Sequence, residues 1–130
     1  MSDYSLVRSS LEEALKLART SQPTEAVARL ERGLKTARAS QDAEAVASLA
    51  RHAGLLSYSA GNDKEAIAYY EEALANGPQD AYLYLALSEA YVSLGQAEPA
   101  RASLARALDL ATQVNDAELL AILKVKLEVR

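Results

Sequence analysis

The chain has 130 residues, half of them apolar, and a formal net charge of −4. The absence of cysteine excludes a disulfide framework, a thiol nucleophile and a cysteine-ligated zinc. The single histidine leaves little material for an imidazole metal site, and the mixed charges lack the basic face that nucleic-acid binding needs. We therefore expect no metal, no cofactor and no nucleic-acid partner.

The residue types predict an all-α protein. Ala, Leu, Glu, Arg and Lys, which favour helices, dominate the chain, and Phe and Trp are absent. The N-terminal stretch MSDYSLVRSSLEE has no apolar segment after a basic start, unlike a signal peptide. No apolar run approaches the length that a membrane-spanning helix needs. We expect a cytoplasmic protein without direct membrane insertion.

Apolar residues recur along the chain at the three-and-four spacing of helices. The pattern predicts seven helices, over residues 4–20, 24–40, 43–60, 64–76, 81–94, 98–113 and 117–130. Asp42, Asp80 and Asp116 each precede an Ala-led helix and are candidate N-caps. The stretch NGP at 76–78 is expected to stop the fourth helix, because glycine suits a left-handed cap and proline cannot continue a helix.

Small and apolar residues repeat in register between the predicted helix pairs. At a spacing of 34 residues the matches are Gly61 and Gly95, Ala66 and Ala100, Ala73 and Ala107, and Leu74 and Leu108. At a spacing of 40 they are Ala26 and Ala66, Leu30 and Tyr70, Gly33 and Ala73, and Leu34 and Leu74. The segment QDAEAVASLAR at 41–51 recurs as NDAELLAILKV at 115–125. The chain thus contains three helix pairs, and its seventh helix begins like the first helix of a fourth pair.

This pattern resembles the tetratricopeptide repeat, a 34-residue helix-turn-helix unit with small residues at positions 8, 20 and 27. With Ala47 as position 1, those positions hold Gly54, Ala66 and Ala73, and with Ala81 as position 1 they hold Ser88, Ala100 and Ala107. The resemblance implies one domain over residues 1–130, an α-α superhelix of about three repeats plus a C-terminal helix. The repeats would cover about 4–41, 42–80 and 81–115, and the last helix about 116–130.

Glycine inside two predicted helices, at Gly33 and Gly54, indicates that helices cross closely there. Glycine in a helix costs about 1 kcal/mol relative to alanine. A close crossing compensates for this cost, because a larger side chain would hold the two backbones apart.

The register of the first helix stays open between two alternatives. The spacing of 40 places Ser10 and Glu13 at positions that are usually apolar. A turn one residue shorter before the second helix would instead place Leu11, Ala14, Leu15 and Ala18 at those positions.

In the tetratricopeptide family the first helix of each pair lines a concave face. The resemblance therefore implies a peptide-binding groove formed by Arg51, His52, Leu55, Tyr58, Tyr82, Leu85 and Glu89. The corresponding positions of the first unit are Arg8, Leu11, Glu12, Leu15, Ala18 and Arg19. Such a surface suits a helix or extended peptide with apolar anchors and an acidic group near Arg51 and His52. Alternatively, Tyr58 and Tyr82 shield the packing seam between helices.

These features favour a scaffold or adaptor that binds a peptide or helix of a partner protein in its concave groove, without catalysis. An enzyme has no support in the sequence, which lacks a Ser/His/Asp arrangement, an HExxH motif and a phosphate-cradling glycine-rich loop.

The last predicted helix, AELLAILKVKLEVR, carries more apolar residues than one face of a terminal helix needs. The excess predicts self-association into a homo-oligomer, or packing of a partner, through Leu119, Ile122, Leu123, Val125 and Leu127. A structural protein that oligomerises through this helix is the alternative function. A further helix that belongs beside it in a longer chain is the other explanation.

Overall fold

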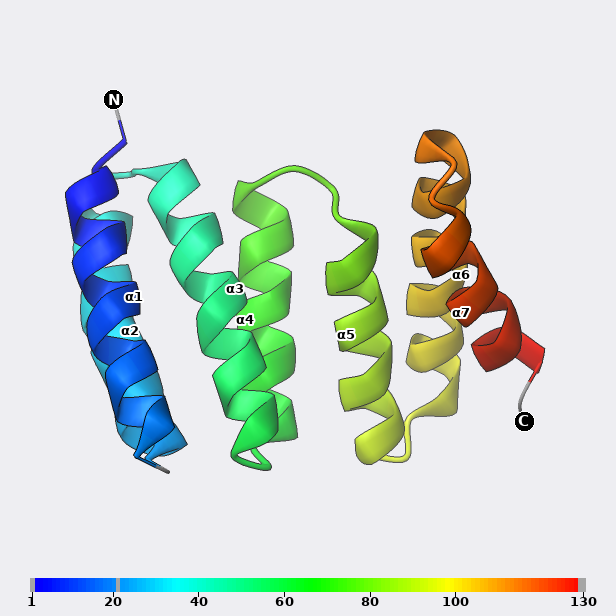
Figure 1. The fold of residues 1–130 in the computed structure, drawn as a ribbon, viewed down its shortest axis with the longest axis horizontal. Coiled ribbons are helices and arrows are strands. Elements are labelled where there is room, and N and C mark those ends of the chain that lie inside the picture. Colours follow the sequence, from blue (N-terminus) through cyan, green and yellow to red (C-terminus); the bar gives the residue numbers. More distant parts are fainter. Residues whose placement is uncertain (1, 21, 129–130) are drawn as a thin grey trace. The chain divides into compact units, whose positions relative to one another are not determined.

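The computed structural model describes residues 2–20 and 22–128. The described residues form seven α-helices and no strand, which confirms the predicted all-α fold (Figure 1). The helices are α1 (Tyr4–Arg19), α2 (Pro23–Ala39), α3 (Ala43–Ser59), α4 (Asp63–Asn76), α5 (Ala81–Ser93), α6 (Ala97–Val114) and α7 (Ala117–Glu128). The bounds of α1 to α6 agree with the predicted ones to within a residue. The last two residues of the predicted seventh helix lie outside the described residues.

The helices belong to two compact units, Met1–Pro78 and Gln79–Arg130. The first unit holds the helix pairs α1–α2 and α3–α4, and the second holds the pair α5–α6 together with α7. The boundary at Pro78 falls close to residue 80, where the second repeat is predicted to end. A single domain over residues 1–130 stays a prediction.

Aspartate side chains cap four of the helices. The carboxylates of Asp42, Asp80 and Asp116 accept hydrogen bonds from backbone N–H groups in the first turns of α3, α5 and α7, at 3.2, 2.9 and 3.1 Å. Asp3 caps α1 in the same way, at 2.9 Å. These bonds satisfy N–H groups that have no partner inside the helix, and they confirm the three predicted N-caps.

Glycine occurs at the ends of helices for two different reasons. Gly61 and Gly95 have φ angles of +82° and +73°, a left-handed backbone that glycine adopts without steric cost. Gly77, in contrast, is extended, with φ −134° and ψ −173°, so the predicted left-handed cap at this position is wrong. A Cβ atom at Gly77 would lie 2.8 Å from the Cβ atom of Ala47 on α3. The close approach of the chain to α3 therefore explains this glycine.

Within the first unit, α1 and α3 form one layer and α2 and α4 form the other (Figure 1). The side chains of Leu30, Leu49 and Tyr70 are fully buried in its core. A Cβ atom at Gly54 would lie 2.5 Å from Cδ1 of Tyr70, and one at Gly33 would lie 2.5 Å from a side-chain oxygen of α1. Both distances are too short for a real Cβ atom, which confirms the two predicted close crossings.

The residues of α1 that face the core are those that the spacing of 40 residues predicts. Ser10 and Ala14 are buried and Leu15 is 51% exposed. The alternative register places Leu15 at a buried position, so the exposure of Leu15 contradicts it. Arg29 of α2 accommodates the polar residues, because its guanidinium donates to Glu13 Oε2 at 2.6 Å and to Ser10 Oγ at 3.3 Å. The hydrogen bond from Arg29 also lowers the pKa of Glu13.

An ionic network joins α2 to α4 on the other layer. Arg38 donates two hydrogen bonds to Glu72, at 2.7 and 2.8 Å, and one to Glu31 at 2.8 Å. The hydroxyl of Tyr69 donates to Glu31 at 2.7 Å. Burial and the hydrogen bond to Glu31 raise the pKa of Tyr69, and the bond to Glu72 raises the pKa of Arg38. This network fixes the two second helices of the pairs side by side.

The second unit has a core of its own, where α7 packs on α6. Leu104, Ala107 and Ala111 of α6 meet Leu119 and Leu123 of α7, and all five are buried. The two leucines are one helical turn apart, so both lie on the face of α7 that α6 covers. Their predicted role in self-association is therefore corrected: Leu119 and Leu123 are core residues.

Candidate functional site

Contacts between the starts of α1 and α3 fix how these two helices lie against each other. The Tyr4 hydroxyl donates to Glu44 Oε1 at 3.0 Å, and Asp42 accepts from Asp3 N at 2.7 Å and from Ser2 Oγ at 2.8 Å. The backbone N–H of Asp3 lowers the pKa of Asp42, and the bond to Glu44 raises the pKa of Tyr4. Because both helices run in the same direction with the same rise, residues 40 apart lie at the same level.

Two leucines lie at the same level on the outer side of this layer. Leu15 of α1 is 51% exposed and Leu55 of α3, 40 residues later, is 42% exposed. Their neighbours Ala14 and Gly54 are buried, so both leucines point away from the core. Tyr58, about one turn further along α3, is 36% exposed. The result is a row of apolar side chains across two adjacent helices.

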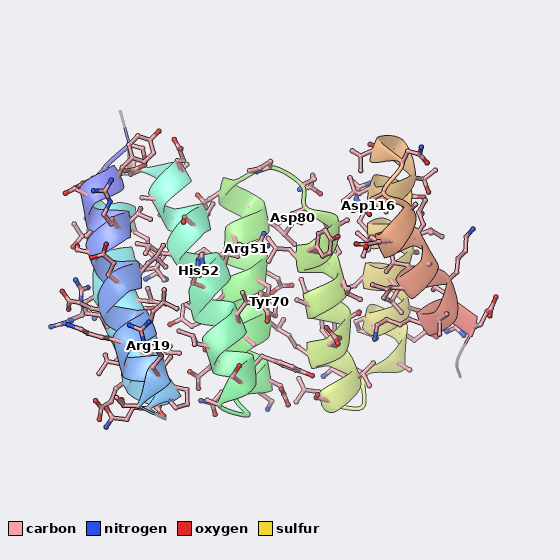
Figure 2. The ribbon with its side chains drawn as sticks, in the orientation of Figure 1. Arg19, Arg51, His52, Tyr70, Asp80 and Asp116 are labelled. Atoms are coloured by element: carbon pink, nitrogen blue, oxygen red, sulfur yellow. The ribbon has the colours of Figure 1, made fainter. Side chains whose placement is uncertain are left out.

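Polar and basic groups flank this row. Arg19 is exposed in the last turn of α1, and Arg51 and His52 are half-buried on α3 (Figure 2). His52 Nδ1 lies 2.9 Å from the backbone oxygen of Ser48. This contact is satisfied when Nδ1 carries the proton, which leaves Nε2 as the acceptor in the neutral ring. We call the surface of Leu15, Arg19, Arg51, His52, Leu55 and Tyr58 the α1/α3 face.

Four of the seven predicted groove residues, Arg51, His52, Leu55 and Tyr58, thus lie together on α3. Leu15 completes the surface, and it is one of the first-unit positions that the resemblance implies for the groove. The signal that finds Leu15 is its spacing of 40 from Leu55.

The other three predicted groove residues lie on α5, in the second unit. Tyr82 is 48% exposed, and its hydroxyl donates to Asp116 at 3.2 Å, which raises the pKa of Tyr82. Leu85 packs against the core cluster of that unit and is half-buried. The carboxylate of Glu89 lies 3.9 Å from Lys126 Nζ of α7. Tyr82 and Leu85 therefore take part in packing within their own unit.

The remaining residues proposed for self-association differ in their exposure. Ile122 and Val125 of α7 are 46% and 60% exposed, whereas Leu127 is half-buried against the core of the second unit. The apolar surface that α7 offers to another molecule therefore comes from Ile122 and Val125.

No helix in residues 2–20 and 22–128 is long and apolar enough to cross a membrane. In the same part of the chain, no three His, Asp or Glu side chains gather in a way that could hold a metal ion.

The arrangement of paired helices agrees with comparisons to known proteins. A family model described as tetratricopeptide repeat matches residues 57–124, over half of the chain. The crystal structure of the TPR domain of Arabidopsis FLU is similar, with a TM-score of 0.75, 22% sequence identity, and coverage of 85% of this chain and 98% of that chain. At this identity the likeness supports the fold alone. No curated protein sequence matches this one. On the match of the family model, the chain belongs to the tetratricopeptide repeat family.

Proposed function

We propose that this protein is a cytoplasmic scaffold or adaptor that binds a peptide or helix of a partner protein on the α1/α3 face, without catalysis. Tetratricopeptide repeat domains generally mediate protein–protein interactions and are typically not catalytic. The observation that supports this surface is the pair of exposed leucines at one level on neighbouring helices, Leu15 and Leu55. Two such anchors can hold apolar side chains of one partner segment.

Burial of this row would supply most of the binding energy. Covering an exposed leucine is worth about 1.5–3 kcal/mol, and a tyrosine adds rigid contact area with a polar tip. Leu15, Leu55 and Tyr58 together therefore suit an amphipathic helix or an extended segment with apolar residues at short spacing.

The flanking groups suit an acidic partner. The guanidinium of Arg19 donates to a carboxylate, and His52 adds a group that becomes a second donor when it is protonated. Arg51 lies next to His52 on the same helix, so basic side chains lie beside the α3 part of the apolar row, whereas Glu12 and Glu13 lie near Leu15 on α1. A partner with apolar anchors and a nearby Asp or Glu fits this surface best.

The double variant Leu15→Glu and Leu55→Glu tests this proposal. Peptides would be selected from a displayed random library on the native protein, and their affinities measured by fluorescence anisotropy. We expect the double variant to bind them at least about tenfold more weakly, because two anchors are replaced by charges.

Ala68→Glu on α4 is the matched control, since this residue is exposed on the other layer of the same unit. The control should bind the peptides as the native protein does, and circular dichroism should show the same helix content in all three. Unchanged affinity of the double variant would place the binding surface elsewhere.

Self-association through α7 remains a second proposal, supported by the exposure of Ile122 and Val125. We expect sedimentation velocity at high micromolar concentration to show oligomers of the native protein and monomers of a Val125→Glu variant. The variant should keep its thermal stability, because this side chain is 60% exposed. A native protein that sediments as a monomer would remove the self-assembly proposal.

A further inference from the structure

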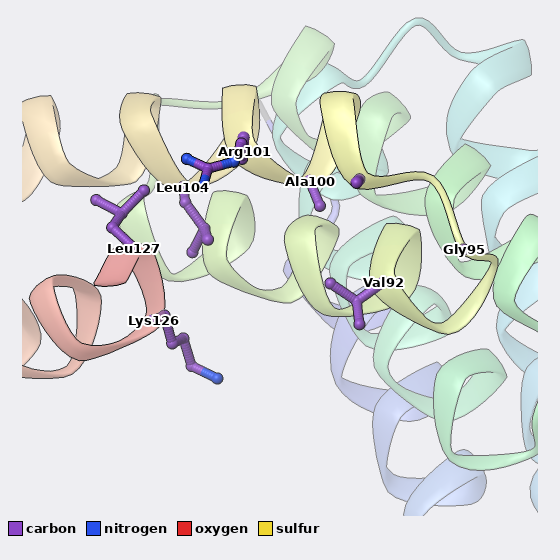
Figure 3. A pocket seen from close by; sticks show the side chains of 8 residues that line it. Val92, Gly95, Ala100, Arg101, Leu104, Lys126 and Leu127 are labelled. Carbon is purple, nitrogen blue, oxygen red and sulfur yellow. The ribbon is translucent and has the colours of Figure 1, made fainter. Parts of the chain in front are cut away.

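Helix α7 presents a short apolar stripe with an acid at one end and a base at the other. Glu118, Ile122 and Val125 are exposed, and their spacings of four and three residues place them on one side of the helix. Lys126 follows Val125 at the edge of this side. Leu127 points toward α6, whereas Lys126 points away from it (Figure 3). We call the surface of Glu118, Ile122, Val125 and Lys126 the α7 stripe.

The repeat shows that a stripe at this position stays accessible when another helix follows. The segment at 115–125 repeats the one at 41–51, so residues of α7 correspond to residues of α3 that lie 74 positions earlier. Ile122 and Val125 correspond to Ser48 and Arg51, which stay partly exposed although α4 packs on α3. The exposure of the α7 stripe is therefore a property of its position in the repeat.

The same order of side chains occurs along α1, at the edge of the α1/α3 face. Glu12, Leu15 and Arg19 are exposed, and their spacings of three and four residues place them on one side of α1. These three residues also line a hollow of about 320 Å³ on this side of the helix. Along α1, as along α7, an acid comes first, an apolar residue second and a base third.

Two helices with this order of charges match when they run in opposite directions. Seven residues, or about 10 Å of helix, separate Glu12 from Arg19. Eight residues, or about 12 Å, separate Glu118 from Lys126. An antiparallel contact therefore pairs both ends at once, with Glu118 beside Arg19 and Lys126 beside the acid of α1. The contact of Lys126 Nζ with Glu89, at 3.9 Å on the surface, contributes little and can be exchanged.

The apolar residues coincide in the same register. Ile122 lies four residues after Glu118. Leu15 lies four residues before Arg19, so the two apolar side chains meet when the charges pair. Val125, one turn further along α7, extends this apolar contact. The α7 stripe thus has both features of the partner that suits the α1/α3 face, an apolar pair and a nearby carboxylate.

The opposite direction of α7 gives a poorer match. A parallel contact with Ile122 at the level of Leu15 brings Glu118 toward Arg51 of α3, which is favourable. The same contact places Lys126 at the level of Arg19, where two positive charges repel each other. The charges therefore favour the antiparallel direction.

We propose that the α7 stripe of one copy of this chain binds the α1/α3 face of a second copy, antiparallel to α1. The inference rests on the proposed function, because it identifies a second copy as the partner that supplies the amphipathic helix. The two surfaces lie in different units and differ from each other, so a bound pair still has one of each available. Head-to-tail contacts of this kind add further copies and form chains or rings.

Mixing two variants tests this pairing. The double variant Leu15→Glu and Leu55→Glu loses the α1/α3 face and keeps the α7 stripe, whereas Val125→Glu loses the stripe and keeps the face. In sedimentation velocity at high micromolar concentration, the native protein should form oligomers and each variant alone should be monomeric. An equimolar mixture of the variants should form dimers and nothing larger, because a single matching pair of surfaces remains.

Each other result of this experiment overturns the proposal. A contact between two α7 stripes would leave the double variant oligomeric, and a contact between two α1/α3 faces would leave Val125→Glu oligomeric. A native protein or a mixture that stays monomeric also contradicts it. Peptides from the displayed library would still report on the α1/α3 face in that case, so a failure of self-docking is distinct from a failure of the proposed function.

An exchange of charges tests the direction of the docked helix. Glu118→Arg and Arg19→Glu should each weaken association about twofold to fivefold, because an exposed ion pair is worth up to about a factor of five. Both changes in one chain should restore the native association, measured by sedimentation equilibrium. Glu98→Arg on α6 is the control, since it is exposed and belongs to neither surface, and it should change nothing. If Arg51→Glu restores the association of Glu118→Arg and Arg19→Glu does not, the antiparallel docking is wrong.

Discussion

Replacing Leu123 by glutamate is expected to lower the free energy of unfolding by about 4 kcal/mol or more and to release α7 from α6. Leu123 is fully buried, at 0% exposure, in the core of the second unit. Truncation of a buried leucine to alanine alone costs about 2–5 kcal/mol. Glutamate adds the cost of removing a carboxylate from water.

The surroundings of Leu123 offer no partner for that carboxylate. The buried residues of the cluster and the partly buried side chains packed on it are alanines, leucines and one tyrosine. A carboxylate in such a place either becomes protonated or draws water into the core, and both outcomes oppose folding. Because stability in stacked helix pairs is largely a sum over neighbours, the loss should be greatest in α6 and α7.

Val125→Glu is the matched control, because it places the same charge on the same helix at a residue that is 60% exposed. Its stability should stay within about 0.5 kcal/mol of the native value. Urea unfolding followed by circular dichroism gives the two free energies, and hydrogen exchange shows whether the amides of α6 and α7 lose protection. Equal stability of the two variants would contradict the burial of Leu123.

The fold could be predicted from the sequence because local and repeated signals agree. Each of Asp42, Asp80 and Asp116 marks a helix start by its chemistry alone, and the apolar spacing gives the helix between caps. The repeat then fixes which small residues face a neighbouring helix. Gly54 is an example, because a glycine inside a helix needs a tertiary explanation and the repeat supplies one.

The register of α1 could not be settled from the sequence, because the spacing of 40 places polar residues at two positions that are usually apolar. Ser10 is buried whereas Glu13 is exposed, and both accept hydrogen bonds from Arg29 of the next helix. A polar residue that is satisfied by a distant partner has no signature in local periodicity. Only the structure, with the contacts of Arg29 to Ser10 and Glu13, decides between the two registers of α1.

The candidate sites show a similar limit. The apolar content of α7 predicts an excess of hydrophobic surface, but content alone does not tell which leucines point inward. Leu119 and Leu123 are buried in the core, whereas Ile122 and Val125 are exposed.

Replacing Tyr70 by alanine is expected to destabilise the protein by about 3–5 kcal/mol, since a large side chain with 1% exposure is removed from the core of the first unit. Gly54→Ala should also destabilise the native protein, by about 1–3 kcal/mol, because the new Cβ atom would lie 2.5 Å from Cδ1 of Tyr70. This cost outweighs the gain in helix propensity, which is about 1 kcal/mol.

The two changes should not be additive, and most of the cost of the second should disappear. Once Tyr70 is alanine, the ring that clashes with the Cβ atom is gone, and the nearest remaining neighbour is the backbone oxygen of Ala66, at 3.3 Å. Gly54→Ala should then change the stability of the Tyr70→Ala variant by less than about 1 kcal/mol, because the gain in helix propensity offsets this tighter contact. Urea unfolding of the native protein, the two single variants and the double variant measures the coupling free energy between residues 54 and 70. If Gly54→Ala has the same effect in both backgrounds, the close crossing of α3 and α4 is not what requires glycine at this position.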